Sequence, residues 1–387
     1  MKTLLFAGLH KPFSKKRLFF YSLSLFSLGN YAQNVPQDST KVNTLDAVMV
    51  KAVRANDKTP MSFSNLSKKE LRERNLGQDI PMLLNFLPSV VTTSDAGNGF
   101  GYTGIRVRGS DASRVNVTVN GIPYNDSESQ GTFWVNMPDF VSSVENVQLQ
   151  RGVGTSTNGA GAFGASLNLL TDAVSQESSG EISNSFGSFN SRKHTVKFGT
   201  GLMNNHFELA GRVSNIASDG FIDRAASALK SYFLQGSYLK NNTLIKALVF
   251  GGTEKTYQSW NGIEDLEKLA NDRTYNVSGE YIDDNGNLKF YDNETDNYKQ
   301  DHYQLHWSQR WSTYWNTNFA LHYTKGEGFY ENYKQGESVK DYGIAPQIIN
   351  GELVEESDVI RRKWLDNDFY GTTFSINYKK EKVDFIA

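Results

Sequence analysis

Residues 104–171 read GIRVRGSDASRVNVTVNGIPYNDSESQGTFWVNMPDFVSSVENVQLQRGVGTSTNGAGAFGASLNLLT. Within this stretch, residues 105–109 and 115–119 alternate polar and apolar side chains, which predicts two short strands. Asn120-Gly121 follows the second run and is a strong signal for a two-residue hairpin turn. Pro138-Asp139 precedes apolar residues at helical spacing, which predicts a helix with Asp139 in its first turn. The stretch therefore predicts a small α+β domain with glycine-rich connections.

Neighbouring segments complete this domain. Residues 147–150 and 166–171 read as further strands, and residues 78–86 predict a short helix that ends near Pro88. Residues 159–164 match G-x-G-x-x-G, the dinucleotide-binding pattern, which needs a helix directly after the glycines. A strand-like segment follows instead, so we predict no nucleotide site there.

The stretch resembles the plug domain of TonB-dependent outer-membrane receptors. The resemblance rests on Arg108-Gly109, on the hairpin at 121–123 and on residues 147–171, which follow the family's order and approximate spacing. Ser89 and Ala165 depart from the family pattern, which more often has glycine at both positions. The resemblance implies a membrane all-β barrel of about 22 strands around an N-terminal α+β plug.

Composition agrees with an envelope protein. The formal net charge is −2, which leaves no global basic footprint for nucleic acid. There is no cysteine, so disulfides and thiolate metal sites are excluded. A mean hydropathy of −0.50 is compatible with a membrane barrel, because its strands alternate lipid-facing and lumen-facing residues.

The N-terminus predicts export. Basic residues up to Arg17 precede an apolar run at 18–28, which is typical of a signal peptide cleaved after Ala32. An N-terminal membrane anchor is the alternative. The polar segment that follows contains a run that resembles a TonB box, formed by Leu45, Asp46, Ala47, Val48, Met49 and Val50. The resemblance implies that this run pairs with a strand of the TonB-type energy-transducing protein of the inner membrane.

The remainder of the chain reads as barrel strands. Fifteen of the 19 tyrosines and five of the six tryptophans lie beyond Gly180, as expected for the aromatic girdles of an outer-membrane barrel. We predict eight strands, at 180–187, 192–201, 206–216, 230–239, 243–252, 301–311, 314–324 and 369–379. In the clearest of them, Leu305 and Trp307 share one face while Gln304 and His306 share the other.

The connections between these strands sort by length. The second, fourth and sixth are tight, whereas the third, fifth and seventh are long, as in barrels with short periplasmic turns and long outer loops. A hairpin within 343–354 would extend outside the membrane. Eight strands cannot enclose a plug, so we predict that the chain is a fragment whose ninth strand starts near Val383. The predicted domains are a signal peptide at 1–32, a mobile periplasmic segment at 33–56, the plug at 57–177 and the first part of the barrel at 178–387.

Two groups of residues are candidates for function. For charge contacts between plug and barrel we name Arg106, Arg108, Arg114, Arg151 and Glu145, with Glu208 and Arg212 on the barrel side. For ligand contacts at the plug apex we name Asp95, Asn98, Phe100 and Tyr102. For the first group, the alternative is a set of charge contacts that only hold the plug in place. For the second, the alternative is a flexible glycine-rich loop without ligand contacts.

The resemblance implies TonB-dependent import of a scarce extracellular solute, above all an iron–siderophore complex, across the outer membrane. Cobalamin, haem or an oligosaccharide are alternative solutes, and a passive channel or adhesin is an alternative function. The expected partners are the TonB-type protein, outer-membrane lipid and a small ligand such as a metal chelate, with no nucleic acid. No residue set predicts catalysis or a cofactor. His302, His306 and His322 could bind a metal, although solvated lumen histidines are the simpler interpretation.

Overall fold

The structure is a computed structural model that describes residues 54–57, 59–154 and 161–387. The predicted signal peptide at 1–32 and the predicted TonB box at 45–50 lie outside the described residues. All described residues belong to one compact unit, Thr40–Ala387. Within the described part of the chain, no helix combines the length and the apolar character needed to cross a membrane.

The N-terminal domain is built on a five-stranded sheet. Its strands are β1 (Ser62–Ser67), β4 (Val115–Val119), β5 (Ile122–Pro123), β6 (Val144–Arg151) and β7 (Ala165–Thr171). They lie in the order β1-β6-β7-β4-β5, and only the β4–β7 pair is parallel. Asn120 and Gly121 both have positive φ, at 55° and 82°, as a type I′ hairpin turn requires. The predicted hairpin is therefore confirmed.

Short elements surround this sheet. They are the β2–β3 hairpin (Val90–Ser94 and Thr103–Val107), the helices α3 (Lys68–Arg74) and α4 (Ile80–Leu84), and the 3₁₀ turns η1 (Ala112–Arg114), η2 (Trp134–Asn136) and η3 (Phe140–Ser143). The helix predicted after Pro138 is only the 3₁₀ turn η3, and Asp139 makes no capping hydrogen bond to it. The prediction of an ordinary helix was wrong because the Asp139 carboxylate is used elsewhere.

The glycine-rich run before β7 serves packing rather than phosphate binding. Strand β7 begins directly after Gly164, so no helix N-terminus follows the glycines. A Cβ added at Gly164 would lie 2.3 Å from the Cβ of Ser110, so the backbone can approach this closely only with glycine. The strand predicted directly after this motif is confirmed.

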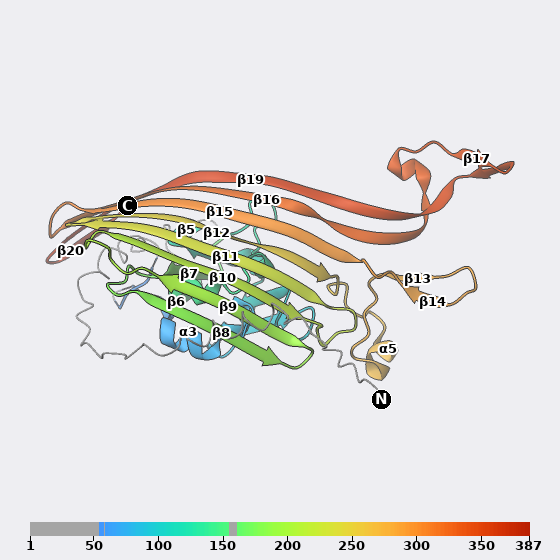
Figure 1. Cartoon of the computed structure of the whole chain (residues 1–387), viewed down its shortest axis with the longest axis horizontal. Coiled ribbons are helices and arrows are strands. Elements are labelled where there is room, and N and C mark those ends of the chain that lie inside the picture. The colour runs from blue at the N-terminus through green and yellow to red at the C-terminus, as the bar shows by residue number, and fades with distance from the viewer. Residues whose placement is uncertain (1–53, 58, 155–160) are drawn as a thin grey trace, which may run out of the picture. The chain divides into compact units, whose positions relative to one another are not determined.

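A long antiparallel sheet of nine strands follows. Its strands are β8 (Ser179–Gly187), β9 (Ser191–Gly199), β10 (Phe207–Ser218), β11 (Ser227–Lys240), β12 (Thr243–Tyr257), β15 (Thr295–Arg310), β16 (Trp315–Ser338), β19 (Glu356–Lys380) and β20 (Val383–Ile386). They lie side by side in sequence order (Figure 1). All eight predicted strands and the predicted start of a ninth are present. Strands β15, β16 and β19 extend well beyond their predicted ends.

The connections between the strands alternate between short and long as predicted. Tight turns at 241–242 and 311–314 lie at one end of the sheet, whereas the segments 258–294 and 339–355 lie at the other end (Figure 1). These longer segments contain α5 (Leu266–Asn271), η5 (Val339–Tyr342) and the hairpins β13–β14 (Glu280–Ile282, Leu288–Phe290) and β17–β18 (Gln347–Ile349, Glu352–Val354). Strands of three residues are too short to cross a bilayer. The hairpin expected within 343–354 is therefore present and is too short to cross a bilayer.

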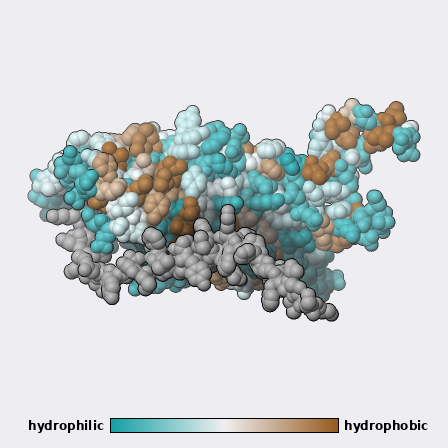
Figure 2. All heavy atoms as spheres, viewed as in Figure 1, coloured by the Kyte–Doolittle hydropathy of each residue, from teal (hydrophilic) through white to brown (hydrophobic). Residues whose placement is uncertain are grey.

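The two faces of the sheet differ as the alternation predicts. Leu305 is 45% exposed on the outer face, whereas the neighbouring His306 is 1% exposed on the inner face. Leu305 pairs with Leu321 and Ala247, so apolar side chains continue across adjacent strands. Apolar residues gather over the part of the sheet nearer its tight turns, and hydrophilic residues dominate toward the loops (Figure 2). The inner face is polar yet buried, because the N-terminal domain packs against it.

That packing includes an apolar core shared by both parts. Phe233 and Phe250 on the inner face join the cluster that contains Phe140, Val147 and Leu149 of the N-terminal domain. The rings of Phe140 and Phe250 lie 4.9 Å apart. Each such side chain contributes about 2 kcal/mol when it is removed from water. The domain therefore adheres to the sheet through apolar contact as well as polar contact.

The arrangement makes a topological prediction. Single cysteines replacing Asp284 and Ile348 in the two loop hairpins should react with a membrane-impermeant maleimide on intact cells. A cysteine replacing Asn242 in a tight turn should react only after the outer membrane is permeabilised, because the predicted barrel topology places the two ends of the strands on opposite sides of the membrane. The absence of native cysteine leaves no background label. Labelling of Asn242→Cys on intact cells would overturn this topology.

Candidate functional site

A buried carboxylate joins the N-terminal domain to the long sheet. Asp139 Oδ1 lies 2.7 Å from Lys193 Nζ on β9, and Oδ2 lies 3.4 Å from Arg212 Nη1 on β10. Thr195 and Ser214 donate hydroxyl hydrogen bonds to Oδ2 at 2.7 and 2.6 Å. The side chains of Asp139, Lys193 and Arg212 are at most 2% exposed. Four barrel-side groups therefore converge on one carboxylate.

The backbone of Asp139 contributes to this geometry. Its φ of 52° is in the left-handed region, where aspartate is among the residues that tolerate the conformation. Burial by itself would raise the pKa of Asp139, but the positive charges of Arg212 and Lys193 outweigh it and hold that pKa well below its ordinary value. The carboxylate is therefore ionised at any physiological pH.

Asp172 forms a second charged contact. It follows β7 and pairs with Lys197 on β9 and with Lys68 of α3, whose Nζ lies 2.6 Å from Oδ1. Lys246 on β12 also donates to the backbone carbonyl of Asp172 at 2.8 Å. Burial would raise the pKa of Asp172, but Lys197 and Lys68 lower it below its ordinary value. Two aspartates thus carry the charged contacts that reach β9, β10 and β12.

The arginines and the glutamate named from the sequence lie elsewhere in the N-terminal domain. Arg151 donates to Ser64 and Ser62 of β1, Arg114 lies over the ring of Phe163, and Glu145 pairs with Lys68. Arg106 and Arg108 lie on the exposed side of the β3 turn. Within the described residues, the ion pairs formed by these five side chains include none to strands β8–β20.

Both residues that the sequence analysis named on the sheet side make polar contacts. Arg212 contacts Asp139, and Glu208 Oε1 accepts a hydrogen bond from the backbone of Ser175 at 2.9 Å. Asp139 and Asp172 themselves were missed as contacts. The available signal was the inward position of Lys193 and Lys197 on a predicted strand, which requires acidic partners from whatever fills the interior.

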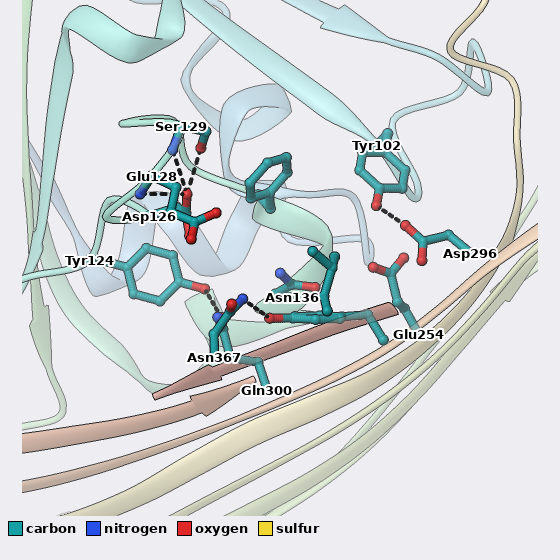
Figure 3. Close-up of a pocket in the computed structure, with 13 residues that line it drawn as sticks. Tyr102, Tyr124, Asp126, Glu128, Ser129, Asn136, Glu254, Asp296, Gln300 and Asn367 are labelled. Carbon is teal, nitrogen blue, oxygen red and sulfur yellow. Dashed lines mark hydrogen bonds between the residues drawn. The ribbon is translucent and has the colours of Figure 1, made fainter. Parts of the chain in front are cut away.

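A cavity of about 250 Å³ lies between the N-terminal domain and the inner face of β12, β15 and β19 (Figure 3). Its lining residues are Tyr102, Tyr124, Asp126, Glu128, Ser129, Phe133, Asn136, Glu254, Asp296, Tyr298, Gln300, Leu365 and Asn367. The Tyr102 hydroxyl donates to Asp296, and the Tyr124 hydroxyl donates to Gln300 at 3.2 Å. Two tyrosines of one part therefore meet polar groups of the other.

The electrostatic surroundings keep Tyr102 protonated. Burial, Glu254 and Asp296 all raise the pKa of Tyr102 well above its ordinary value. Its ring also meets Trp260 edge-on, with 5.0 Å between the ring centroids. Tyr102 is therefore a fixed hydrogen-bond donor at the rim of the cavity.

Of the four predicted ligand contacts, Tyr102 lines the cavity. Asn98 instead donates to Ser218 of β10 at 2.6 Å, and the buried ring of Phe100 packs with Ile216 and Leu229 of the sheet. Asp95 is half-buried, and burial raises the pKa of its carboxyl group. The loop thus supports Tyr102 by holding the β2–β3 hairpin against β10 and β11.

The histidines considered for metal binding take part in other contacts. His302 Nδ1 lies 2.9 Å from Thr324 Oγ1, and His306 Nε2 lies 3.2 Å from Gln304 Oε1. Across the described ranges, no group of three or more His, Cys, Asp or Glu side chains is arranged to hold a metal ion. The histidines belong to the polar inner face of the sheet.

The sequence model of the family "TonB-dependent Receptor Plug Domain" matches residues 55–166. The chain carries the plug domain of a TonB-dependent receptor. The five-stranded sheet, its hairpins and the two aspartate contacts therefore belong to a receptor plug, and strands β8–β20 have the order and the loop pattern of the receptor barrel.

Several known proteins resemble this chain at low sequence identity. The vitamin B12 transporter BtuB of Vibrio cholerae serotype O1 is 24% identical over 160 residues, covering 41% of this chain and 26% of that protein. The siderophore receptor PiuA from Acinetobacter baumannii has a TM-score of 0.60 at 16% identity, over 88% of this chain and 46% of its own. The ferric-catecholate import receptor Fiu from E. coli K12, in its open form, has a TM-score of 0.60 at 14% identity, over 84% and 47%. These likenesses show the fold alone, and this chain spans less than half the length of each relative.

The Asp139 contact makes a stability prediction. Asp139→Asn leaves Lys193 and Arg212 buried without a counter-charge, which should cost about 3–5 kcal/mol in the free energy of unfolding of the plug. Urea unfolding of the purified receptor, followed by protease sensitivity of the plug, measures this loss. Glu145→Gln is the control, because its pair with Lys68 is partly exposed and should change stability by less than about 1 kcal/mol. Equal stability of the two variants would contradict the role of Asp139.

Asp79 makes a pH prediction. Its side chain accepts a hydrogen bond from Thr103 at 3.0 Å, and burial raises the pKa of Asp79 to about 8. An unfolded aspartate titrates near about 3.9, so stability from this site is complete below about pH 4 and is lost as pH rises through about 8. Asp79→Asn should therefore gain thermal stability over the native receptor as pH increases across this window. Asp111→Asn, an exposed control, should show no such gain.

Proposed function

We propose that this receptor imports a scarce extracellular solute across the outer membrane, with energy from a TonB-type protein of the inner membrane. The observation that carries the proposal is a plug held against the inner face of the barrel strands by Asp139 and Asp172. A plug in this position obstructs the path along that face. Solute passage therefore requires work on the plug, and an energised partner supplies it.

Lipid contact fits the same proposal. The outer face of the sheet presents apolar side chains such as Leu305, Leu321 and Phe374, with 41–62% of each exposed. Such a face is stable against the hydrocarbon of a bilayer, and the predicted signal peptide at 1–32 would direct the chain there. The outer membrane is thus the proposed location.

The route of force begins at the proposed TonB box, Leu45–Val50. An extended segment can add to a strand edge of the partner through main-chain hydrogen bonds. The first strand of the described residues is β1, which lies at the edge of the plug sheet and pairs with β6. A pulling force on the N-terminal segment would act first on the six residue pairs between β1 and β6. It would act next on the contacts of Asp139 and Asp172 with the barrel.

We propose an iron chelate, such as a siderophore complex, as the solute. Support comes from the number of siderophore receptors with the same fold, of which PiuA and Fiu are two. Cobalamin is the second candidate, because the vitamin B12 transporter BtuB is 24% identical to this chain over 160 residues. A haem or oligosaccharide importer, and a passive channel or adhesin, are the remaining alternatives.

Val48→Pro tests energised import. Proline removes a main-chain donor from the box, so pairing with the TonB-type protein and uptake should both be lost. The measurements are cross-linking to that protein and growth on iron-limited or cobalamin-limited medium, in cells whose only copy of the receptor gene carries the substitution. Val48→Ala is the matched control, because it keeps the donor. Full uptake by Val48→Pro would instead support a passive channel.

A further inference from the structure

The cavity between plug and barrel is acidic. Four of its lining residues are carboxylates, namely Asp126, Glu128, Glu254 and Asp296, and no lysine or arginine lines it within the described residues. This contrasts with Asp139 and Asp172, whose carboxylates each have two cationic partners. The barrel strands thus compensate the plug's acidic groups in one place and add acidic groups in another.

Two of these carboxylates are buried together on the barrel side. Glu254 of β12 and Asp296 of β15 are 6% exposed each, and both project into the cavity (Figure 3). Asp296 Oδ2 accepts the hydrogen bond from Tyr102, whereas Oδ1 has no hydrogen-bond partner in the described structure. An unpaired buried carboxylate oxygen is costly, which makes it a ready acceptor for a donor brought by a ligand.

Aromatic rings supply the other walls. Tyr102, Tyr124, Phe133 and Tyr298 line the cavity, and Trp260 supports Tyr102 from behind. The face of an aromatic ring attracts a cation through its quadrupole, and the attraction strengthens when the site is desolvated. Both the aromatic rings and the carboxylates therefore favour a cationic ligand. The rings attract it through cation–π interaction, and the carboxylates accept its hydrogen bonds.

We infer that this cavity binds the cationic end of an organic solute, an ammonium or guanidinium group. Its N–H groups would donate to Asp296 Oδ1 and to Glu254, and its adjoining carbon atoms would lie against Tyr102 and Tyr298. A polyanionic chelate finds no lysine or arginine in this lining, within the described residues, to compensate its charge and is disfavoured. This inference rests on the proposed import function, and it narrows the solute to one that carries a positive group.

Three small probes of similar size test the inference on the purified full-length receptor. They are phenethylamine, which is cationic, 3-phenylpropionate, which is anionic, and 2-phenylethanol, which is neutral. Isothermal titration calorimetry should show phenethylamine binding at least about tenfold more tightly than the other two. Equal affinity for the three probes, tighter binding of the anion, or no binding of the cation would each overturn the inference.

Variants locate the binding. Asp296→Asn and, independently, Glu254→Gln should each weaken phenethylamine binding about tenfold, with heat-modifiable migration confirming that the variants fold. The matched control is Asp301→Asn, a carboxylate of the same strand on the opposite face, where it accepts from Tyr232. It should bind as the native receptor does. Unchanged binding by both Asp296→Asn and Glu254→Gln would overturn the assignment.

The result is separable from the test of import. Val48→Pro bears on energised uptake and leaves the cavity untouched, whereas the probe measurements need no energy source. If Val48→Pro abolishes uptake and the three probes bind with equal affinity, the inference of a cationic solute is wrong, while the proposal of energised import stands. If phenethylamine binds selectively and Val48→Pro retains full uptake, the proposal of energised import is wrong, while the binding site for a cationic group stands.

Discussion

The ion pairs of Asp139 with Lys193 and Arg212 are the constraint on which the plug–barrel arrangement depends. A carboxylate without exposed surface is tolerated only with compensation, and here two cations, three hydroxyl groups and the Asn75 amide provide it. The contact requires lysine, threonine, arginine and serine on the inner faces of β9 and β10. The backbone of Asp139 is left-handed at this contact, directly before the 3₁₀ turn η3.

The interior of the barrel strands is therefore neither a simple polar lumen nor a simple core. Phe233 and Phe250 continue the apolar core of the plug, while Lys246 and Gln235 bond to the backbone after β7. Toward the loops, the same inner face carries Glu254 and Asp296 beside Tyr102, with one carboxylate oxygen unpartnered. The carboxylates that hold the plug have lysine and arginine partners, whereas no lysine or arginine lines the cavity within the described residues. This difference in charge compensation separates a structural contact from a candidate binding site.

Alternation of side chains was enough to predict the strands because one face meets lipid and the other meets the plug. It failed at the strand ends. Residues 325–338 of β16 are mainly polar on both faces, because this part of the strand extends past the apolar belt and gains nothing from alternation. The helix predicted at 78–86 shrank to Ile80–Leu84 for a related reason, since five residues suffice to bury its apolar side against the plug core.

The sequence by itself determined four strands of the plug, the Asn120-Gly121 turn, the order of the barrel strands and the end of the sheet at which the long loops lie. These features depend on local patterns, namely period-two alternation, turn residues and connection length. Only the tertiary structure decided which charges meet. Asp139 finds Lys193 at a separation of 54 residues, and Tyr102 finds Asp296 at 194, and no local pattern specifies such partners. Charge pairing in a buried interface is set by where two independently folded surfaces come into register, so the sequence offered candidates and the packing selected among them.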